Sequence, residues 1–407
     1  MADGERLGPA RRRVTIADVA RLAGVSIGTV SNVLNGTAGV REPTPERVEA
    51  AIRELRFRPN VLARSLTGRG SAGERRVIDP AAPRLVAVGY TSVDYTARVE
   101  VLPHRDDRIT AASIEKSLGG PAANVAVIAA GVGDGFPLTV ELVTAIGDDA
   151  DSDWALEELT SKNVDTIAVR RAPGHRLSRC IVLVESNGSR TVINEPFALE
   201  DSDLDRYLGP QTDSRIQCLF IEGFQIERML DSVLAIRASG WRAALQTTGL
   251  PVSWRNPGRL QQMARDLDVV FLNRAVARDA TNCRGGEQQL ITSFIDVATS
   301  TRASAVMILT LGENGAIVIP PQGEPVHVPA KQIETVDATG NGGAFAGAFL
   351  AAWLHTDDPV LAAQWGAAAG SLVTGAEGAQ GVVPSAAELR TFMDVPAPVV
   401  RTPASAS

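Results

Sequence analysis

The sequence lacks a long apolar run. No stretch approaches the ~20 consecutive apolar residues that a membrane-spanning helix needs. The first residues, MADGERLGPARRR, are basic but are not followed by an apolar segment, so they do not read as a secretory signal. We therefore expect a cytoplasmic protein.

Cysteine is also scarce. Cys180, Cys218 and Cys283 lie far apart and show no metal-ligand spacing, which indicates reduced structural thiols. The bulk composition, with 44% hydrophobic and 21% charged residues, is that of an ordinary globular protein. At 407 residues the chain is too long for one ordinary core, so two or more domains are expected.

Charge is distributed unevenly along the chain. Residues 1–76 contain 14 Arg against 8 Asp and Glu, which is a net charge of +6. Because the whole chain has a net charge of −7, residues 77–407 carry a net charge of −13. A basic head on an acidic body is typical of a phosphate-binding module attached to a domain that does not bind nucleic acid.

Three short helical patterns open the chain. Thr15 is placed to cap the first, Gly24 ends it, and Ser26 is placed to cap the second. Thr44 followed by Pro45 is a strong start for the third. Apolar residues recur at helical spacing through all three segments, which predicts one small three-helix core.

The remaining chain follows a different pattern. Residues 67–83 are rich in Gly, Ser, Arg and Pro and are predicted to be a flexible linker. From Arg84 onward, apolar runs of strand length alternate with helical stretches such as 121–131, 151–161 and 341–355, which predicts a mainly parallel sheet with helices on both faces. The strand-like runs are LVAVGY, LVTAIG, CIVLVE, CLFIEG, VVFLN, VMILTLG and AIVIP. Residues 396–407 are expected to form a disordered tail.

The head resembles the helix-turn-helix domain of the lac repressor (LacI) family. The resemblance rests on VTIADVARLAGVSIGTVSNVLNG and TPERVEAAIRELRFRPNVLARSL, which together cover residues 14–66 almost continuously. It implies that the second helix enters the major groove of DNA. By resemblance, the base-reading positions are Ile27, Gly28 and Asn32. The positions that hold the DNA backbone are Thr15, Ser26, Thr29, Ser31 and Asn35. The family usually has Arg at position 32, and Asn suits adenine or a phosphate contact instead.

Residues 58–66, RPNVLARSL, resemble the family's hinge helix. This helix folds when two copies meet in the minor groove, and Leu66 stands at the position of the apolar wedge that bends the duplex. Asn60 and Ala63 are assigned to the same DNA contact. The resemblance implies a homodimer on a pseudo-palindromic operator. Two alternatives are that 58–66 merely ends the third helix, and that the three helices are only a structural module.

The body resembles the ribokinase (PfkB) family of sugar kinases across residues 84–395. The resemblance rests on VAVGYTSVDY, GGPAANVAVIAAGVG at 119–133, ELVTAIGDD at 141–149 and VDATGNGGAFAGAFLAAWL at 336–354. It implies a three-layer α/β domain with a small β lid. The expected organisation is a DNA-binding head at 1–66, a linker at 67–83, an effector and dimerisation domain at 84–395, and the tail.

Three positions depart from the pattern of active kinases. Those relatives read D-T-x-G-A-G-D, and the last Asp is the general base, but this chain has Gly343 there. Their Asn-x-x-Glu motif, which organises Mg²⁺ and phosphate, is matched by Asn273 to Val276, without the carboxylate. Pro121 stands where many relatives have Lys. Loss of a general base typically costs ~10²–10⁴-fold in rate, so no catalytic residue is assigned and a pseudokinase is expected.

The binding positions of the family are retained. The resemblance assigns sugar contacts to Asp94, Gly119, Gly120 and Asn124. It assigns a nucleotide or anion site to Thr310, Gly312, Gly315, Gly340, Asn341, Gly342 and Gly343. The Gly-rich turn opening a helix suits an anion on physical grounds, because its N–H groups and dipole are positive. Asp337 and Thr339 match a monovalent-cation site. Each of these residues also has a plain structural explanation as a turn, cap or fold-preserving residue.

The favoured hypothesis is a nucleoid-associated homodimeric repressor whose inactive kinase-like domain senses a sugar, a sugar phosphate or a related metabolite. No cofactor is required, although ATP or ADP and a monovalent cation have retained sites. The alternatives are an active ATP-dependent sugar kinase that also binds DNA, and a body that is only a dimerisation scaffold. Ligand-dependent operator binding, kinase assays and thermal shift against a metabolite panel discriminate among them.

The hinge assignment predicts that Leu66→Ala weakens operator binding far more than Gly343→Asp does, because only Leu66 is expected to enter the DNA. Operator titration of both variants measures this difference. Equal losses would contradict the hinge assignment.

Overall fold

The computed structural model of the protein consists of two compact units, residues 1–70 and 71–407. The described residues are 16–26, 29–30, 44, 47–48, 50–51, 79–185, 190–196, 199–209, 213–300, 303–321, 323–333, 337, 339–376 and 378–393. Within this part of the chain no helix is long and apolar enough to cross a membrane.

The described part of the first unit agrees with the predicted helical head. Helix α1 spans Ile16–Ala23 and ends at Gly24, whose φ of +64° is the left-handed conformation that glycine adopts readily. The Ser26 Oγ accepts a hydrogen bond from the Thr29 N–H at 3.1 Å, as an N-cap does. A small core joins residues of all three predicted helices: Val19, Ala20, Ala23, Val30, Val48 and Ala51.

Most of the predicted DNA contacts lie outside the described residues. These are Thr15, Ile27, Gly28, Ser31, Asn32, Asn35, Asn60, Ala63 and Leu66. Most of the predicted linker and the whole predicted tail also lie outside them. The assignments for these residues remain predictions.

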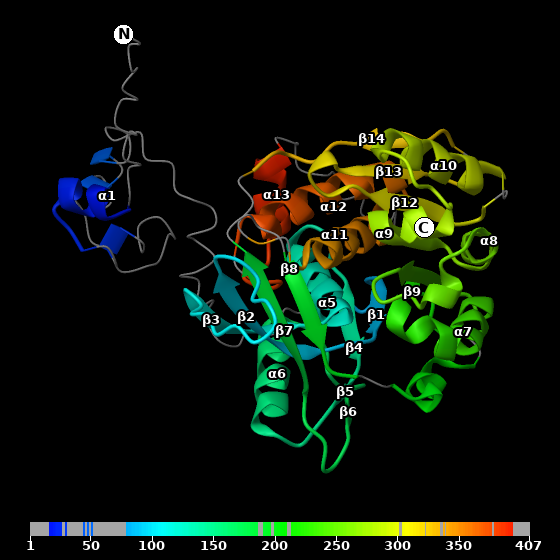
Figure 1. Ribbon diagram of the computed structural model, residues 1–407, viewed down its shortest axis with the longest axis horizontal. Coiled ribbons are helices and arrows are strands. Elements are labelled where there is room, and N and C mark those ends of the chain that lie inside the picture. Colours follow the sequence, from blue (N-terminus) through cyan, green and yellow to red (C-terminus); the bar gives the residue numbers. More distant parts are fainter. Residues whose placement is uncertain are drawn as a thin grey trace, which may run out of the picture. The chain divides into compact units, whose positions relative to one another are not determined.

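The second unit is built on a twisted eight-stranded sheet (Figure 1). Its strand order is β14-β13-β12-β11-β10-β9-β1-β4, parallel from β12 to β4 and antiparallel at the β12–β13–β14 edge. The strands are β1 (Arg84–Val88), β4 (Thr139–Val143), β9 (Gln217–Glu222), β10 (Arg242–Gln246), β11 (Val269–Asn273), β12 (Val306–Thr310), β13 (Ala316–Ile319) and β14 (Val326–Val328).

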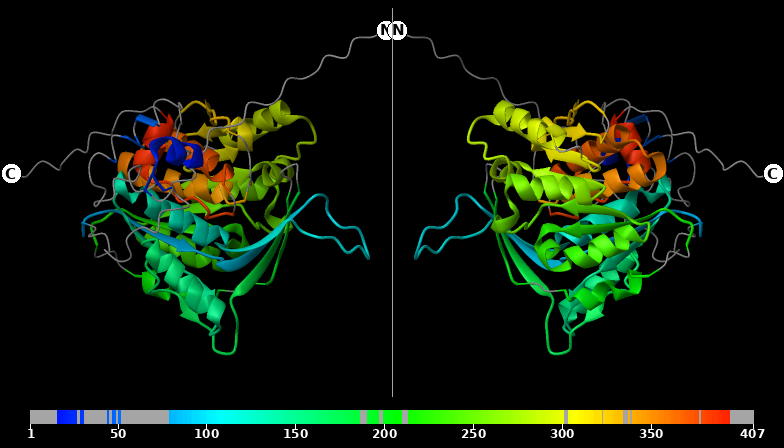
Figure 2. Two further views of the ribbon diagram at one scale, coloured as in Figure 1. Left: turned by 90° about the vertical axis from the view of Figure 1, so that its left-hand side faces the viewer. Right: turned by 90° about the vertical axis from the view of Figure 1, so that its right-hand side faces the viewer.

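A separate four-stranded sheet forms a lid. Its order is β3-β2-β7-β8, and it consists of β2 (Ser92–Val99), β3 (Ser113–Gly119), β7 (Ser178–Glu185) and β8 (Arg190–Asn194). The β2–β3 connection projects clear of the rest of this unit in both views of Figure 2. A two-residue pair, β5 (Ala145–Ile146) with β6 (Arg170–Arg171), completes the strands.

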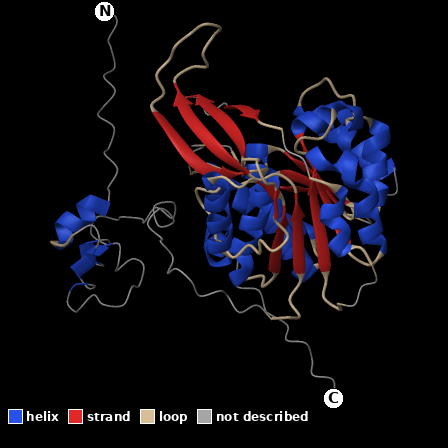
Figure 3. Cartoon of the chain, turned by 90° about the horizontal axis from the view of Figure 1, so that it is seen from below, coloured by secondary structure: helices blue, strands red, loops and turns tan. Residues whose placement is uncertain are grey.

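Helices cover both faces of the central sheet (Figure 3). One hydrophobic core joins the sheet to α5 (Pro121–Gly131), α6 (Ala150–Ser161), α11 (Asn341–Thr356), α12 (Pro359–Thr374) and α13 (Ala386–Met393). The other joins it to α7 (Gly223–Ala238), α8 (Pro257–Asp266), α9 (Arg274–Ala280) and α10 (Glu287–Ser300). Short 3₁₀ turns are η1 (Val132–Asp134), η2 (Asp201–Tyr207), η3 (Val252–Trp254) and η4 (Gly312–Asn314). The predicted three-layer α/β domain with a β lid is therefore confirmed.

Candidate functional site

A cavity of about 740 Å³ lies at the carboxyl ends of the parallel strands, where α/β folds commonly bind ligands. Its walls come from the β1–β2 turn, the first turn of α5, the lid strands β7 and β8, the ends of β10, β11 and β12, and the start of α11. The predicted residues on its surface are Asp94, Gly120, Asn124, Thr310, Gly312, Thr339, Gly340, Asn341, Gly342 and Gly343. The fold thus brings most of the predicted body site together.

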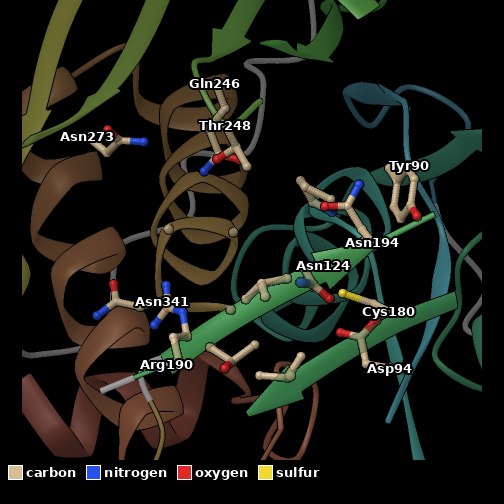
Figure 4. Close-up of a pocket in the computed structure, with 18 of the residues that line it drawn as sticks. Tyr90, Asp94, Asn124, Cys180, Arg190, Asn194, Gln246, Thr248, Asn273 and Asn341 are labelled. Atoms are coloured by element: carbon tan, nitrogen blue, oxygen red, sulfur yellow. The ribbon is translucent and has the colours of Figure 1, made fainter. Parts of the chain in front are cut away.

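Asp94 is held rigidly at one end of the cavity (Figure 4). It is 6% exposed, and the Ser92 hydroxyl donates a 2.6 Å hydrogen bond to its Oδ1. Gly119 packs directly against the carboxylate. A Cβ at this position would lie only 2.0 Å from the Asp94 Oδ2, so the close approach requires glycine. Burial raises the pKa of Asp94 from 3.8 to about 6, with a further increase from Asp337 and an opposing effect of the Ser92 bond. Asp94 is therefore a fixed acceptor suited to hydroxyl groups.

Two further residues shape this end. Gly120 has a φ of +100°, and a Cβ on it would lie 2.2 Å from the Tyr90 carbonyl oxygen, so the turn into α5 requires glycine. The Asn124 Oδ1 accepts a 2.8 Å hydrogen bond from the Gln380 Nε2. Because the oxygen is already bound, the Asn124 amide group is left with donors for a ligand.

Glu222 organises the same turn and was not predicted. Its side chain is fully buried, and its two oxygens accept the N–H groups of Tyr90 at 2.9 Å and Ala122 at 3.2 Å. Burial raises the pKa of Glu222 to about 8, although these hydrogen bonds act in the opposite direction. The residue positions the backbone around Asp94 and the start of α5. In the sequence, Glu222 belongs to the apolar run CLFIEG, which predicts a strand but does not indicate a role for the carboxylate.

The start of α11 forms the other end of the cavity. Gly340 caps the helix with a φ of +82°, and its carbonyl accepts the Ala344 N–H at 2.8 Å. The N–H groups of Asn341, Gly342 and Gly343 precede the first intrahelical bond, so the helix itself provides no partner for them. Such a helix start attracts anions.

Position 343, which the resemblance matches to the general base of active relatives, lies against helix α5. A Cβ on Gly343 would lie 2.8 Å from the Asn124 Cβ, and one on Gly347 would lie 2.7 Å from the Val125 carbonyl oxygen. Helix α11 therefore approaches α5 more closely than side chains at these two positions would allow.

The expected magnesium motif is also altered. The Asn273 Oδ1 accepts the Val276 N–H at 2.9 Å and so caps α9, while Val276 is 2% exposed and packs in the core. Among the residues that the structure describes, no cluster of three or more His, Cys, Asp or Glu could hold a metal ion. Arg274, the next residue after Asn273, lines the cavity instead and was missed by the sequence analysis.

Asp337 lies behind the α11 turn and is 1% exposed. Its two oxygens accept the N–H groups of Thr339 at 2.8 Å and Gly378 at 3.0 Å. These bonds fix the loop that leads into α11. The assignment of Asp337 and Thr339 to a monovalent cation remains a proposal.

A smaller cavity of about 230 Å³ adjoins the first and shares Arg274, Thr310, Gly312 and Asn341 with it. Gly315 lines only this second cavity, and its φ of +81° and a Cβ position 2.0 Å from the Val328 carbonyl oxygen require glycine. The predicted nucleotide edge thus lies on one continuous surface.

Comparisons with known proteins agree with this architecture. The model of the pfkB family of carbohydrate kinases matches residues 82–386. The chain belongs to this family. The model of bacterial regulatory proteins of the lacI family matches residues 15–60. The chain therefore joins a lacI-type regulatory domain to a carbohydrate kinase-like domain.

Individual relatives match one part or the other. An ATP-dependent ribose-1-phosphate kinase of Halopiger xanaduensis is 29% identical over 318 residues, covering 76% of this chain and 98% of the relative. The ribose operon repressor of Escherichia coli is 58% identical over 52 residues, which are 13% of this chain and only 16% of the repressor. Ribokinase from Giardia lamblia superposes with a TM-score of 0.65 at 16% identity, covering 76% of this chain and 99% of that structure.

The raised pKa of Asp94 predicts that Asp94→Asn increases the stability of the protein at pH 8. In the folded protein this pKa is about 6 instead of 3.8, so the stability contribution of the residue is lost as the pH rises from about 4 through 6. The shift of roughly two units corresponds to at most about 3 kcal/mol in the free energy of unfolding. Urea unfolding at pH 8 and at about pH 4.5 measures the gain, which should shrink at the lower pH. A variant less stable than the natural protein at pH 8 would contradict this assignment.

Proposed function

We propose that the protein is a DNA-binding repressor whose carbohydrate kinase-like domain binds a sugar or a related metabolite without phosphorylating it. The proposal includes a homodimer that acts at the nucleoid in the cytoplasm. The observation that carries it is Gly343: the residue at the position of the general base has no side chain, and the packing against Asn124 leaves no room for one. The retained Asp94 and the free N–H groups of α11 support ligand binding.

The proposed repressor couples ligand to DNA through the lid. Strands β7 and β8 contribute Cys180, Val182, Arg190, Val192 and Asn194 to the cavity wall, so a ligand there contacts the lid and the body of the domain together. A ligand shifts an equilibrium only by its difference in affinity between two states, and a contact made only when the lid is closed supplies such a difference. In this proposal, closure alters the dimer and hence the pairing of the two DNA-binding heads.

An active kinase is the second candidate, favoured by the intact α11 turn and by Asp94. Incubation of the purified protein with ATP and a panel of sugars tests it. We expect no phosphorylated sugar from the natural sequence. Turnover at ordinary kinase rates, about 1–100 s⁻¹, would overturn the proposal.

Gly343→Asp and Gly343→Ala sharpen this assay as a matched pair. Both place a Cβ against Asn124, and overpacking of this kind typically costs about 1–3 kcal/mol, so we expect both to be destabilised and neither to transfer phosphate. Thermal unfolding and product analysis measure the two effects. Restored turnover in Gly343→Asp alone would mean that the missing carboxylate, and not the packing, is what prevents catalysis.

The homodimer is proposed to form through the outer face of the lid. Along a strand, side chains alternate between faces, so Ile181 and Ile193 point away from the cavity that Cys180 and Val192 line. They are directly paired across β7 and β8 and are 47% and 57% exposed. Ile114 of β3, which is separated from β7 by β2 and lies on the same face as Ile181, is 68% exposed. An exposed apolar face of this kind is typical of an interface.

The double variant Ile181→Asp/Ile193→Asp is expected to convert the dimer to a monomer and to reduce operator affinity, because charges cannot be buried in the interface without partners. Light scattering after size exclusion measures the mass. Ile167→Asp, at a site 71% exposed outside the lid, serves as the control. Dimers of the double variant would exclude this face as the interface.

A further inference from the structure

The charged residues on the main cavity are unevenly placed. Among its described lining residues, Asp94 is the one carboxylate, whereas Arg190 and Arg274 are two guanidinium groups. In the view of Figure 4, Arg190 and Asn341 appear on one side of the cavity, and Asp94 and Asn124 appear on the other. One end of the cavity therefore suits hydroxyl groups, and the other carries excess positive charge.

Arg190 belongs to lid strand β8 and is exposed. It makes no hydrogen bond or ion pair with any described residue, whereas both other arginines of the lid strands, Arg98 and Arg179, have partners, such as Asp151 for Arg179. Its five donors are available to a ligand.

Arg274 is oriented by the protein and only partly neutralised. Its Nη2 contacts the Glu287 carboxylate at 2.5 Å, and that carboxylate also accepts the Asn314 Nδ2 at 2.6 Å. Its Nε is buried without a hydrogen-bond partner among the described residues. The guanidinium lines both cavities and lies next to Gly312, where a Cβ would be 3.4 Å from the Nη1.

Among the described residues, this end of the main cavity offers a divalent metal no carboxylate. Mg²⁺ at a phosphate site is usually anchored by one or two carboxylates, but Val276 is apolar and buried, and the Arg274 guanidinium repels a cation placed beside it. The same guanidinium supplies positive charge and N–H donors to a phosphate without a metal, and Arg–phosphate pairs are often bidentate. The free N–H groups at the start of α11 line the same wall.

We infer that the cavity binds a phosphorylated sugar in the absence of divalent metal, with the phosphate held by Arg274, Arg190 and the start of α11 and the sugar hydroxyls held by Asp94 and Asn124. This inference rests on the proposed function and names the class of its effector. It assigns Arg274 the charge that a metal ion would otherwise supply.

The phosphate subsite is tested first with inorganic phosphate, added to the full chain in EDTA at constant ionic strength. We expect phosphate to raise the melting temperature, and we expect Arg274→Gln and Arg190→Gln to abolish this rise. Arg284→Gln removes the same charge from an exposed site outside both cavities and should respond like the natural protein. No rise, a rise that requires Mg²⁺, or equal rises in all variants would overturn the inference.

Calorimetry with pentose and hexose phosphates, each beside its unphosphorylated sugar, tests the effector class. For any sugar that binds, we expect its phosphate to bind at least tenfold more tightly than the free sugar in EDTA. Arg274→Gln should remove this preference for the phosphate while changing the affinity for the free sugar less than twofold. Equal binding of both members would overturn the inference.

Operator titration with the same compounds separates the two proposals. If uncharged sugars change operator affinity and sugar phosphates do not, the inferred phosphate subsite is contradicted and the proposed repressor function is retained. If a sugar phosphate binds through Arg274 and operator affinity does not change, the subsite stands and the proposed function fails.

Discussion

The contact between helices α5 and α11 sets the geometry on which the site depends. Gly343 and Gly347 let the α11 backbone meet Asn124 and Val125 at distances that no side chain would permit. Beyond this contact, Phe349 packs edge-on against Phe271 of the sheet, with ring centroids 5.2 Å apart. The two helices therefore belong to one rigid core, and the groups at their first turns keep a fixed spacing across the cavity.

The same contact separates binding from catalysis. Backbone N–H groups at the start of α11 do not depend on the side chain at position 343, so the proposed anion site does not require that side chain. Asp94 is equally independent, because Ser92, Gly119 and the backbone organised by Glu222 hold it. A general base, in contrast, exists only as a side chain. In the proposed function, this division lets the kinase-like fold keep its pocket without a general base.

The sequence predicted the parts whose signals are local. Helix α5 begins at the predicted residue 121, where Pro121 occupies the first turn, and ends at the predicted residue 131, and the apolar runs located seven strands. The lid strands β3 and β8, SIEKSLG and RTVIN, were not predicted because they are largely exposed and carry no apolar run. Arg190 and Arg274 were missed for a different reason: they are 84 residues apart, and only the fold brings a lid strand and the end of β11 to one cavity. Long-range arrangement of this kind has no local pattern.

In the proposed repressor the loss of catalysis is itself useful. A sensor must report the concentration of its ligand at equilibrium, and phosphoryl transfer would consume that ligand and make occupancy depend on ATP as well. In this proposal Gly343 removes the phosphoryl-transfer step, and Arg274, held by its ion pair with Glu287, takes the place of a dissociable metal ion. Because Arg190 lies on the lid and Arg274 on the body, a phosphate held by both favours the closed lid over the open one. That difference in affinity is the free energy that a ligand can pass to the DNA-binding heads.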